Sequence, residues 1–452
     1  MAALQRILWP ADSELHYPTQ MDTERKQDVS AARSVAFDLL RAVLTKNTPL
    51  DDAIAVHDGL NKLPRRDRGF ARSIVGVALR RLGQIDALIE SFVEKPLPRQ
   101  ASAVRDILRL AVGELMFLDV APHAAVDSAV TLVESRGHPK FKGLVNAVLR
   151  RTAKEGRERL ADLPVELNYQ SWMIESWQAA YGADTAHVIA ESSLTAPTLD
   201  ISVKADPEIW AEKLEASLLP TGSLRREFDG AVTGLPGFDE GAWWVQDAAA
   251  ALPAKLLGDI RGKRIFDLCA APGGKTLQLA AMGANVLAVD RSPKRLKRLE
   301  RNLDRLDLRA GVAAADITGW TPPSQPDAIL LDPPCTATGT IRRHPDILHA
   351  KGIGDLAKLT NLQFRLLARA AGMLGPGGRL VYCTCSMQSE EGESQVARAL
   401  TELPLERDPV TADELGGLDR LLTADGDIRT GPHLYRELGG FDGFFIARFR
   451  KK

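Results

Sequence analysis

The hydrophobic pattern of the chain changes near residue 245. Between residues 28 and 155, apolar residues such as Val35, Leu39 and Val43 recur at helical spacing, which predicts amphipathic helices. From residue 245 onwards, short apolar runs alternate with longer periodic stretches. That alternation predicts strands and helices in turn, and therefore a doubly wound sheet. We expect a multidomain protein with an all-α N-terminal domain and a C-terminal α/β domain.

The segments outside these two regions are less regular. Residues 1–27 are polar and aperiodic, and we expect a flexible tail there. Residues 156–244 contain tryptophans that favour a helical connector, and residues 199–203 alternate as a strand does. The expected division is therefore a tail, a helical domain, a connector with a small α+β region, and a C-terminal domain, at residues 1–27, 28–155, 156–244 and 245–452.

Three apolar runs of the C-terminal domain end in a turn or an acid. The run at 264–269 leads to Gly273 and Gly274, and two later runs lead to Asp290 and Asp316. Ligands of open parallel sheets bind beyond the carboxyl ends of strands, and an acid after the second strand hydrogen-bonds a ribose. Adjacent glycines also let the backbone approach a ligand closely. This pattern fits NAD or S-adenosylmethionine. The turn is not G-x-G-x-x-G, which favours S-adenosylmethionine.

Two further strand ends carry thiols. One apolar run precedes Asp332 and Cys335, and another precedes Cys383 and Cys385. A thiol at such an edge is placed to act as a nucleophile, although a strand cysteine is more often a packing residue. We expect Cys269 and Cys383 to be packing residues, and the other two thiols to indicate covalent catalysis. No metal site is expected, because the chain has no C-x-x-C pair and no histidine at ligand spacing near these thiols.

Six motifs occur together in one order. They are Val-Gln-Asp at 245–247, Asp-Leu-Cys-Ala-Ala-Pro-Gly-Gly-Lys-Thr at 267–276, Pro-Cys at 334–335, Ile-Arg-Arg-His-Pro-Asp at 341–346, Thr-Cys-Ser at 384–386 and Asp-Gly-Phe-Phe-Ile-Ala at 442–447. Over residues 28–450 the chain closely resembles the bacterial ribosomal RNA cytosine-C5 methyltransferases of the Fmu/Sun (RsmB) type. The resemblance implies a Rossmann-like S-adenosylmethionine-dependent methyltransferase domain, a NusB-like RNA-binding domain and a small α+β region that helps to hold RNA.

The resemblance also implies roles for individual residues. It assigns the thiol that attacks cytosine C6 to Cys385, assistance in product release to Cys335, and contact with the base to Asp332. Lys275 is a candidate for activating Cys385 and orienting Asp332. The expected cofactor-binding residues are Cys269, Ala270, Ala271, Pro272, Gly273, Gly274, Lys275, Asp290, Asp316 and Asp332.

The chain departs from the family pattern in three places. Pro333 stands where Ala is usual, Thr336-Ala337 where Ser-Gly is usual, and the family often carries Arg and Asn around Leu199-Asp200-Ile201-Ser202. Asp332-Pro333-Pro334 thereby approaches the signature of amino-group methyltransferases. We expect a 16S rRNA cytosine-C5 methyltransferase. A tRNA cytosine-C5 methyltransferase, an amino-group methyltransferase and a non-catalytic RNA-binding factor remain as alternatives.

The overall charge gives no general attraction to RNA. The 452 residues contain 58 Lys and Arg against 59 Asp and Glu. Residues 28–155 hold twenty basic against fifteen acidic residues, most densely between Arg65 and Arg81, which fits either RNA contact or a solvated helix face. Four cysteines are sparse usage, as in a reducing cytosol, and no apolar stretch has membrane length. We expect a cytoplasmic monomer whose partner is 16S rRNA, unassembled or in a partly assembled small subunit, with no membrane association.

Overall fold

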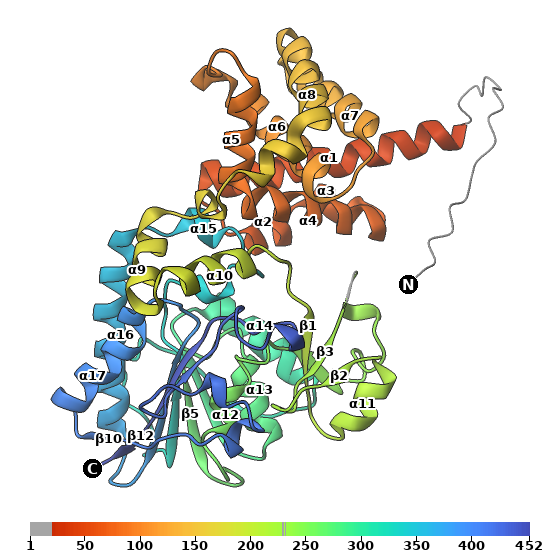
Figure 1. Cartoon of the computed structure of the whole chain (residues 1–452). Helices are drawn as coiled ribbons and strands as arrows, with labels where there is room; N and C mark the ends of the chain where they lie inside the picture. The colour runs from red at the N-terminus through yellow and green to blue at the C-terminus, as the bar shows by residue number, and fades with distance from the viewer. Residues whose placement is uncertain (1–19, 228–229, 231) are drawn as a thin grey trace, which may run out of the picture.

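A computed structural model describes residues 20–227, 230 and 232–452 (Figure 1). Its N-terminal part is a bundle of helices, drawn in red to yellow at the top of Figure 1. The helices are α1 (Gln20–Lys46), α2 (Leu50–Val56), α3 (Asp58–Lys62), α4 (Arg65–Arg80), α5 (Leu82–Phe92), α6 (Ser102–Phe117), α7 (Pro122–Ser135) and α8 (Lys142–Ala161).

The bundle forms because each helix has one apolar face. In α4, for example, Ala71, Ile74, Val75 and Ala78 are all buried, at the spacing that places them on one side of a helix. One ion pair lies inside this core: Nη2 of Arg33 lies 2.5 Å from Oε2 of Glu114, and both side chains are almost fully buried.

The start of the chain differs from the expected tail. Residues 20–27 form the first turns of α1, so the helix begins inside the segment 1–27, of which residues 1–19 lie outside the described part. The basic stretch of α4 also differs from a uniform solvated face. Arg65 and Arg72 are exposed, but Arg81 lies over the ring of Phe117, with 5.0 Å from its Cζ to the ring centroid.

Two helices connect the bundle to the C-terminal domain, α9 (Ser171–Tyr181) and α10 (Ala183–Ser193). Nε1 of Trp177 donates to Oε1 of Gln388 at 2.9 Å, and the hydroxyl of Tyr181 donates to the carbonyl of Met387 at 2.7 Å. The connector therefore packs on the loop that follows the Thr-Cys-Ser motif.

A small four-stranded sheet follows, in the order β2-β3-β1-β4, with all neighbours antiparallel. Its elements are β1 (Leu199–Val203), α11 (Pro207–Lys213), β2 (Ser217–Leu218), β3 (Leu224–Arg226) and β4 (Trp243–Val245). Ile201, Leu214, Leu224 and Trp243 form its core. This is the expected α+β region, and it lies beside the C-terminal domain (Figure 1).

The C-terminal domain is built on one mixed sheet in the order β10-β12-β9-β8-β5-β6-β7, with β11 paired to β12. Its strands are β5 (Arg264–Leu268), β6 (Asn285–Asp290), β7 (Gly311–Ala314), β8 (Ala328–Leu331), β9 (Arg379–Thr384), β10 (Leu405–Arg407), β11 (Ile428–Arg429) and β12 (Phe445–Lys451). From β7 to β9 the strands are parallel, whereas β12 runs antiparallel to β9. The chain winds from β5 outwards to β7 and then returns to β8 on the other side of β5. This point of reversal is where such sheets bind ligands.

Helices cover both faces of this sheet. They are α12 (Leu252–Lys255), α13 (Gly274–Ala281), α14 (Pro293–Arg305), α16 (Ile353–Met373) and α17 (Glu393–Glu402). The short α15 (Ile347–Ala350) packs with α9 and α10 instead. Because strand side chains alternate between faces, Val381 and Cys383 pack in one core and Leu380 and Tyr382 in the other. The expected architecture is confirmed: an all-α N-terminal domain, a small α+β region and a Rossmann-like C-terminal domain.

The helical domain docks on the loop after Cys335. Nη2 of Arg80 donates to the carbonyl of Arg342 at 2.7 Å, and the backbone N–H of Leu50 donates to Oδ2 of Asp346 at 3.1 Å. Nε2 of His349 lies 2.8 Å from the carbonyl oxygen of Leu79. The two domains therefore meet at a loop that belongs to the candidate site.

The buried ion pair yields a stability prediction. Glu114→Ala should lower the free energy of unfolding of the helical domain by about 3–5 kcal/mol, because it removes the buried carboxylate that accepts hydrogen bonds from the guanidinium of Arg33. Glu134→Ala breaks the exposed pair with Lys142 in the same domain and should cost less than about 1 kcal/mol. Amide hydrogen exchange in α6 measures both changes. Equal losses of unfolding free energy in the two variants would show that the buried pair contributes no more to stability than the exposed pair.

Candidate active site

The register of three parallel strands brings the candidate residues together. Leu268 of β5 pairs with Leu331 of β8, which pairs with Tyr382 of β9. The residues that follow these strands therefore lie at one edge of the sheet. The backbone N–H of Asp332 continues the ladder by donating to the carbonyl of Leu268 at 3.2 Å.

The thiols of Cys335 and Cys385 are in contact, with 3.4 Å between their sulfur atoms. A hydrogen bond with Cys385, together with burial, holds the pKa of the Cys335 thiol well above its ordinary value. Cys335 therefore keeps its proton at neutral pH and can donate it to the sulfur of Cys385. Cys383 is fully buried, and burial raises its pKa.

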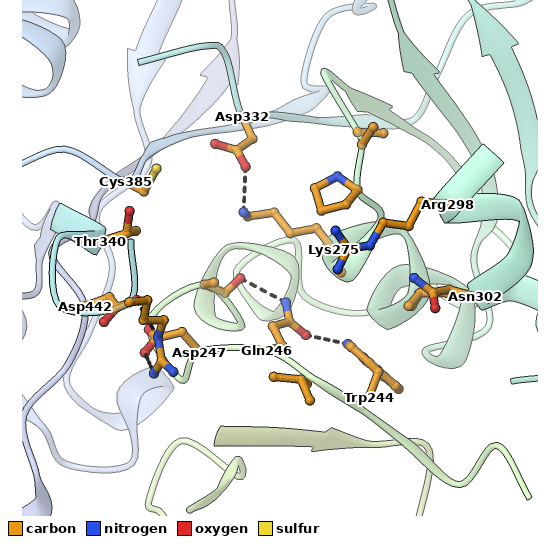
Figure 2. A pocket seen from close by; sticks show the side chains of 18 of the residues that line it. Trp244, Gln246, Asp247, Lys275, Arg298, Asn302, Asp332, Thr340, Cys385 and Asp442 are labelled. Atoms are coloured by element: carbon orange, nitrogen blue, oxygen red, sulfur yellow. Dashed lines mark hydrogen bonds and ion pairs between the residues drawn. The ribbon is translucent and has the colours of Figure 1, made fainter. Parts of the chain in front are cut away.

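Lys275 and Asp332 form an ion pair beside these thiols. Nζ of Lys275, at the start of α13, lies 2.7 Å from Oδ2 of Asp332, and Figure 2 shows this pair next to Cys385. Burial alone would lower the pKa of Lys275, but the carboxylate of Asp332 raises it above its usual value. Lys275 is therefore a fixed cation that orients Asp332.

A buried polar clamp holds the backbone on both sides of Cys335. The side chain of Gln363, in α16, donates to the carbonyl of Pro334 at 2.9 Å and to Oε1 of Glu391 at 2.8 Å. Glu391 in turn accepts the backbone N–H of Thr336 at 2.9 Å. Gln363 and Glu391 are both fully buried. The position of the Cys335 thiol thus depends on two residues distant in sequence.

The Ile-Arg-Arg-His-Pro-Asp loop is held by a group of buried charges that we call the ion cluster. Arg343 lies at its centre, with 2.6 Å from Nη2 to Oδ2 of Asp247 and 2.8 Å from Nε to Oδ2 of Asp442. Burial alone would raise the pKa of Asp247, but Arg343 and Arg342 lower it below its usual value. The ion cluster contains three acids and three arginines, Asp200, Arg225, Asp247, Arg342, Arg343 and Asp442.

Asp200, in the stretch that departs from the family pattern, belongs to the ion cluster. Its Oδ2 lies 2.6 Å from Nη2 of Arg225 and also accepts the backbone N–H of Ala248 at 3.0 Å. The carboxylate is fully buried. In this chain the position is therefore structural, and it joins the small sheet to the C-terminal domain.

A first cavity lies over the ends of β5, β6 and β8, and we call it the Asp290 cavity. Asp290 is 2% exposed, and its Oδ1 and Oδ2 accept the backbone N–H groups of Ser292 and Ala271. Asp316 and the apolar Ile317 and Leu366 also line it. A buried carboxylate near an apolar slot suits the ribose and adenine of S-adenosylmethionine. Of the expected cofactor residues, Cys269, Ala271, Pro272, Asp290, Asp316 and Asp332 line this cavity.

A second cavity adjoins the first, and we call it the Trp244 cavity (Figure 2). The two measure about 370 and 500 Å³ and share Asp332 and Cys385, within the range of small-molecule sites. Ala270, Gly274 and Lys275 line only the Trp244 cavity.

Gly273 lines neither cavity. Its φ of 113° excludes most side chains, and a Cβ there would lie 2.7 Å from Leu299. The residue is needed for the turn and for helix packing.

The described residues contain neither a group of metal ligands nor a membrane-spanning helix. Across residues 20–452, apart from the undescribed positions, no three His, Cys, Asp or Glu side chains gather as metal ligands. Within the same part of the chain, no helix has the length and apolar character that crossing a membrane requires.

Comparisons with known proteins agree with this geometry. The family model for 16S rRNA methyltransferase RsmB/F matches residues 254–450, and the NusB family model matches residues 30–154. Ribosomal RNA small subunit methyltransferase B of Pseudomonas putida is 34% identical, and the match covers 94% of this chain and 98% of that protein.

Solved structures share the fold. The crystal structure of PH0851 matches with a TM-score of 0.73 and 24% identity, covering 94% of this chain and 99% of that one. A methyltransferase homologue from Pyrococcus horikoshii matches with a TM-score of 0.53 and 26% identity, covering 63% of this chain and 96% of that one.

The fold and the paired cavities define an S-adenosylmethionine-dependent methyltransferase with an added NusB-like domain. At this identity over nearly the full length of both chains, the protein belongs to the ribosomal RNA small subunit methyltransferase B family, a family of rRNA cytosine-C5 methyltransferases. The expected family, enzyme class and cofactor are thereby confirmed.

The clamp generates a prediction. Gln363→Ala should lower the free energy of unfolding by about 1–3 kcal/mol, because the buried carbonyl of Pro334 and the buried carboxylate of Glu391 each lose a hydrogen bond. Asn361→Ala, on the exposed side of the same helix, should change it by less than about 0.5 kcal/mol. Chemical denaturation followed by hydrogen exchange in β9 measures both. A Gln363→Ala variant as stable as Asn361→Ala would show that the clamp is dispensable.

Proposed function

We propose that this protein methylates C5 of a cytosine in 16S rRNA through a covalent bond between Sγ of Cys385 and C6 of the base. The observation that carries the proposal is the contact of the two thiols beside the Lys275–Asp332 pair, at the junction of the two cavities. The Trp244 cavity would receive the base, and the Asp290 cavity the cofactor. The names of the relatives favour rRNA over tRNA.

The first step activates the base. C5 of cytosine is too electron-poor to accept a methyl group directly. Addition of the Cys385 thiolate to C6 forms a C–S bond and breaks the C5–C6 double bond, while N3 takes up a proton from water and C5 becomes nucleophilic. Asp332, oriented by Lys275, would hydrogen-bond the N3–N4 edge and stabilise that proton. S-adenosylmethionine supplies an electrophilic methyl group to C5 when it is bound.

The second step releases the product. The C5 proton and the N3 proton pass to water, and breakage of the bond between C6 and sulfur restores the aromatic ring. The electron pair of that C–S bond returns to Cys385. Cys335 keeps its proton and lies 3.4 Å from this sulfur. It would therefore assist release by donating a hydrogen bond to the departing thiolate.

The remaining parts of the chain would serve recognition. The target base must leave its stack to meet the thiol, so a single-stranded or flipped nucleotide is the natural substrate. We propose that residues 28–155 form an RNA-binding domain and that the small sheet helps to hold the strand. The enzyme would act as a cytoplasmic monomer on free rRNA or on a partly assembled subunit.

The amino-group alternative has weaker support. Asp332-Pro333-Pro334 is followed by Cys335 rather than by an aromatic residue. A thiol pair also has no role in methylating an exocyclic amine.

Cofactor binding can be tested at Asp290. Asp290→Ala should weaken S-adenosylmethionine binding by more than about tenfold, because a charged acceptor of hydrogen bonds is lost. Asp290→Asn removes the charge but keeps one acceptor for the turn, so it separates ribose contact from local folding. Asp304→Ala, an exposed acid on α14, is the matched control. Calorimetry that shows unchanged affinity in both Asp290 variants would remove this residue from the site.

The two thiols can be separated by their products. Cys385→Ser should abolish methyl transfer and form no covalent RNA adduct. Cys335→Ala should still add to the base and methylate it, and then accumulate a protein–RNA conjugate that depends on S-adenosylmethionine. A denaturing gel with labelled 16S rRNA measures the conjugate.

Cys383→Ala is the matched control for the gel, because this thiol lies two residues before Cys385, inside β9, and lines neither cavity. It should methylate without trapping RNA. A conjugate in Cys385→Ser but not in Cys335→Ala would reverse the two roles. Methylation that survives in both variants, without a conjugate, would exclude covalent catalysis.

A further inference from the structure

Helix α14 and its flanks carry a concentrated positive charge in a chain that is otherwise balanced. Residues 291–309 contain eight basic side chains against the acids Glu300, Asp304 and Asp307, whereas the whole chain has 58 basic and 59 acidic residues. The basic residues are Arg291, Lys294, Arg295, Lys297, Arg298, Arg301, Arg305 and Arg309. The charged side chains of a helix often face only solvent, so charge alone does not indicate a binding site. The positions of these side chains relative to the cavities show which of them could bind a ligand.

One face of α14 lies against the Trp244 cavity. Leu296, Leu299 and Leu303 are buried in the domain. Arg298, Asn302 and Arg305 line the cavity, and their spacing of four and three residues places them on one side of the helix. Figure 2 shows Arg298 and Asn302 on the side of the cavity away from Cys385.

The other cations of this cavity already have partners. Lys275 is paired with Asp332, and Arg343 is held in the ion cluster. Arg305 donates to the carbonyls of Phe238 and Trp243. Nδ1 of His344 lies 3.6 Å from Oδ2 of Asp51.

Arg298 is different. Its side chain is exposed, and within the described residues no hydrogen bond or ion pair joins it to another side chain or to the backbone. A guanidinium with all its donors free, at the wall of a cavity that leads to the candidate nucleophile, is suited to a phosphate or carboxylate.

We infer that Arg298 binds a backbone phosphate of the RNA strand next to the target cytidine, with Asn302 beside it as a second hydrogen-bonding group. The inference rests on the proposed function, because a base held between Cys385 and Asp332 places its strand along the cavity. Lys294 and Arg301 extend the same exposed side of α14, so the strand continues over a positive surface. Phosphate contact of this kind positions RNA without reading its sequence.

The test compares charge reversal at two neighbouring positions of α14. Arg298→Glu should weaken binding to an in vitro transcript of 16S rRNA by roughly tenfold, and should lower the slope of log affinity against log salt concentration by about one. Lys297→Glu makes the same change in charge but lies about 100° further round the helix, away from the cavity. It should alter both quantities much less. Arg298→Lys should recover the salt slope and part of the affinity.

Several results would overturn the inference. Equal weakening by Arg298→Glu and Lys297→Glu would indicate a general charge effect, and unchanged RNA affinity in Arg298→Glu would exclude contact. Calorimetry with S-adenosylmethionine checks that each variant is folded. Methyl transfer by the unaltered enzyme to the same transcript is measured in parallel. If it is absent, the proposed function fails, whereas transfer with no effect at Arg298 rejects only the phosphate site.

Discussion

The parallel pairing of β8 with β5 on one side and β9 on the other is the constraint on which the site depends. Backbone hydrogen bonds fix which residues leave the sheet together, so a turn, a carboxylate and a thiol from separate parts of the chain reach one edge. A shift of one residue in β9 would turn Cys385 to the opposite face. Burial on both faces of the sheet makes such a shift costly, because every core side chain would move with it.

Local patterns in the sequence were sufficient to predict where the strands end and which side chains share a face of the sheet. The alternation in β9 placed Cys383 and Cys385 on one side, and the apolar run of β6 located Asp290. The clamp of Gln363 and Glu391 could not be predicted this way, since its hydrogen bonds join residues 28 to 55 positions apart. One signal was available: Gln363 lies on the otherwise apolar stripe of α16, where a buried amide requires partners.

Contacts of charged side chains with residues far away in the sequence also could not be predicted from local patterns. The stretch from Arg65 to Arg81 reads as one basic surface, but Arg80 reaches across a domain boundary to the carbonyl of Arg342. The loop after Cys335 is therefore held by contacts with both the helical domain and the ion cluster. The helical domain thus helps to position a loop of the candidate site through Arg80, which lies in this same basic stretch.

The composition of the ion cluster has a consequence for evolution. Its three acids and three arginines balance, and each is buried or nearly so. An uncompensated charge in such a place is strongly destabilising, whereas a coordinated replacement can be neutral. We therefore expect these six positions to change together. A basic residue in place of Asp200 would leave an excess of buried positive charge unless a neighbouring arginine were replaced as well, so the positions should covary along lineages.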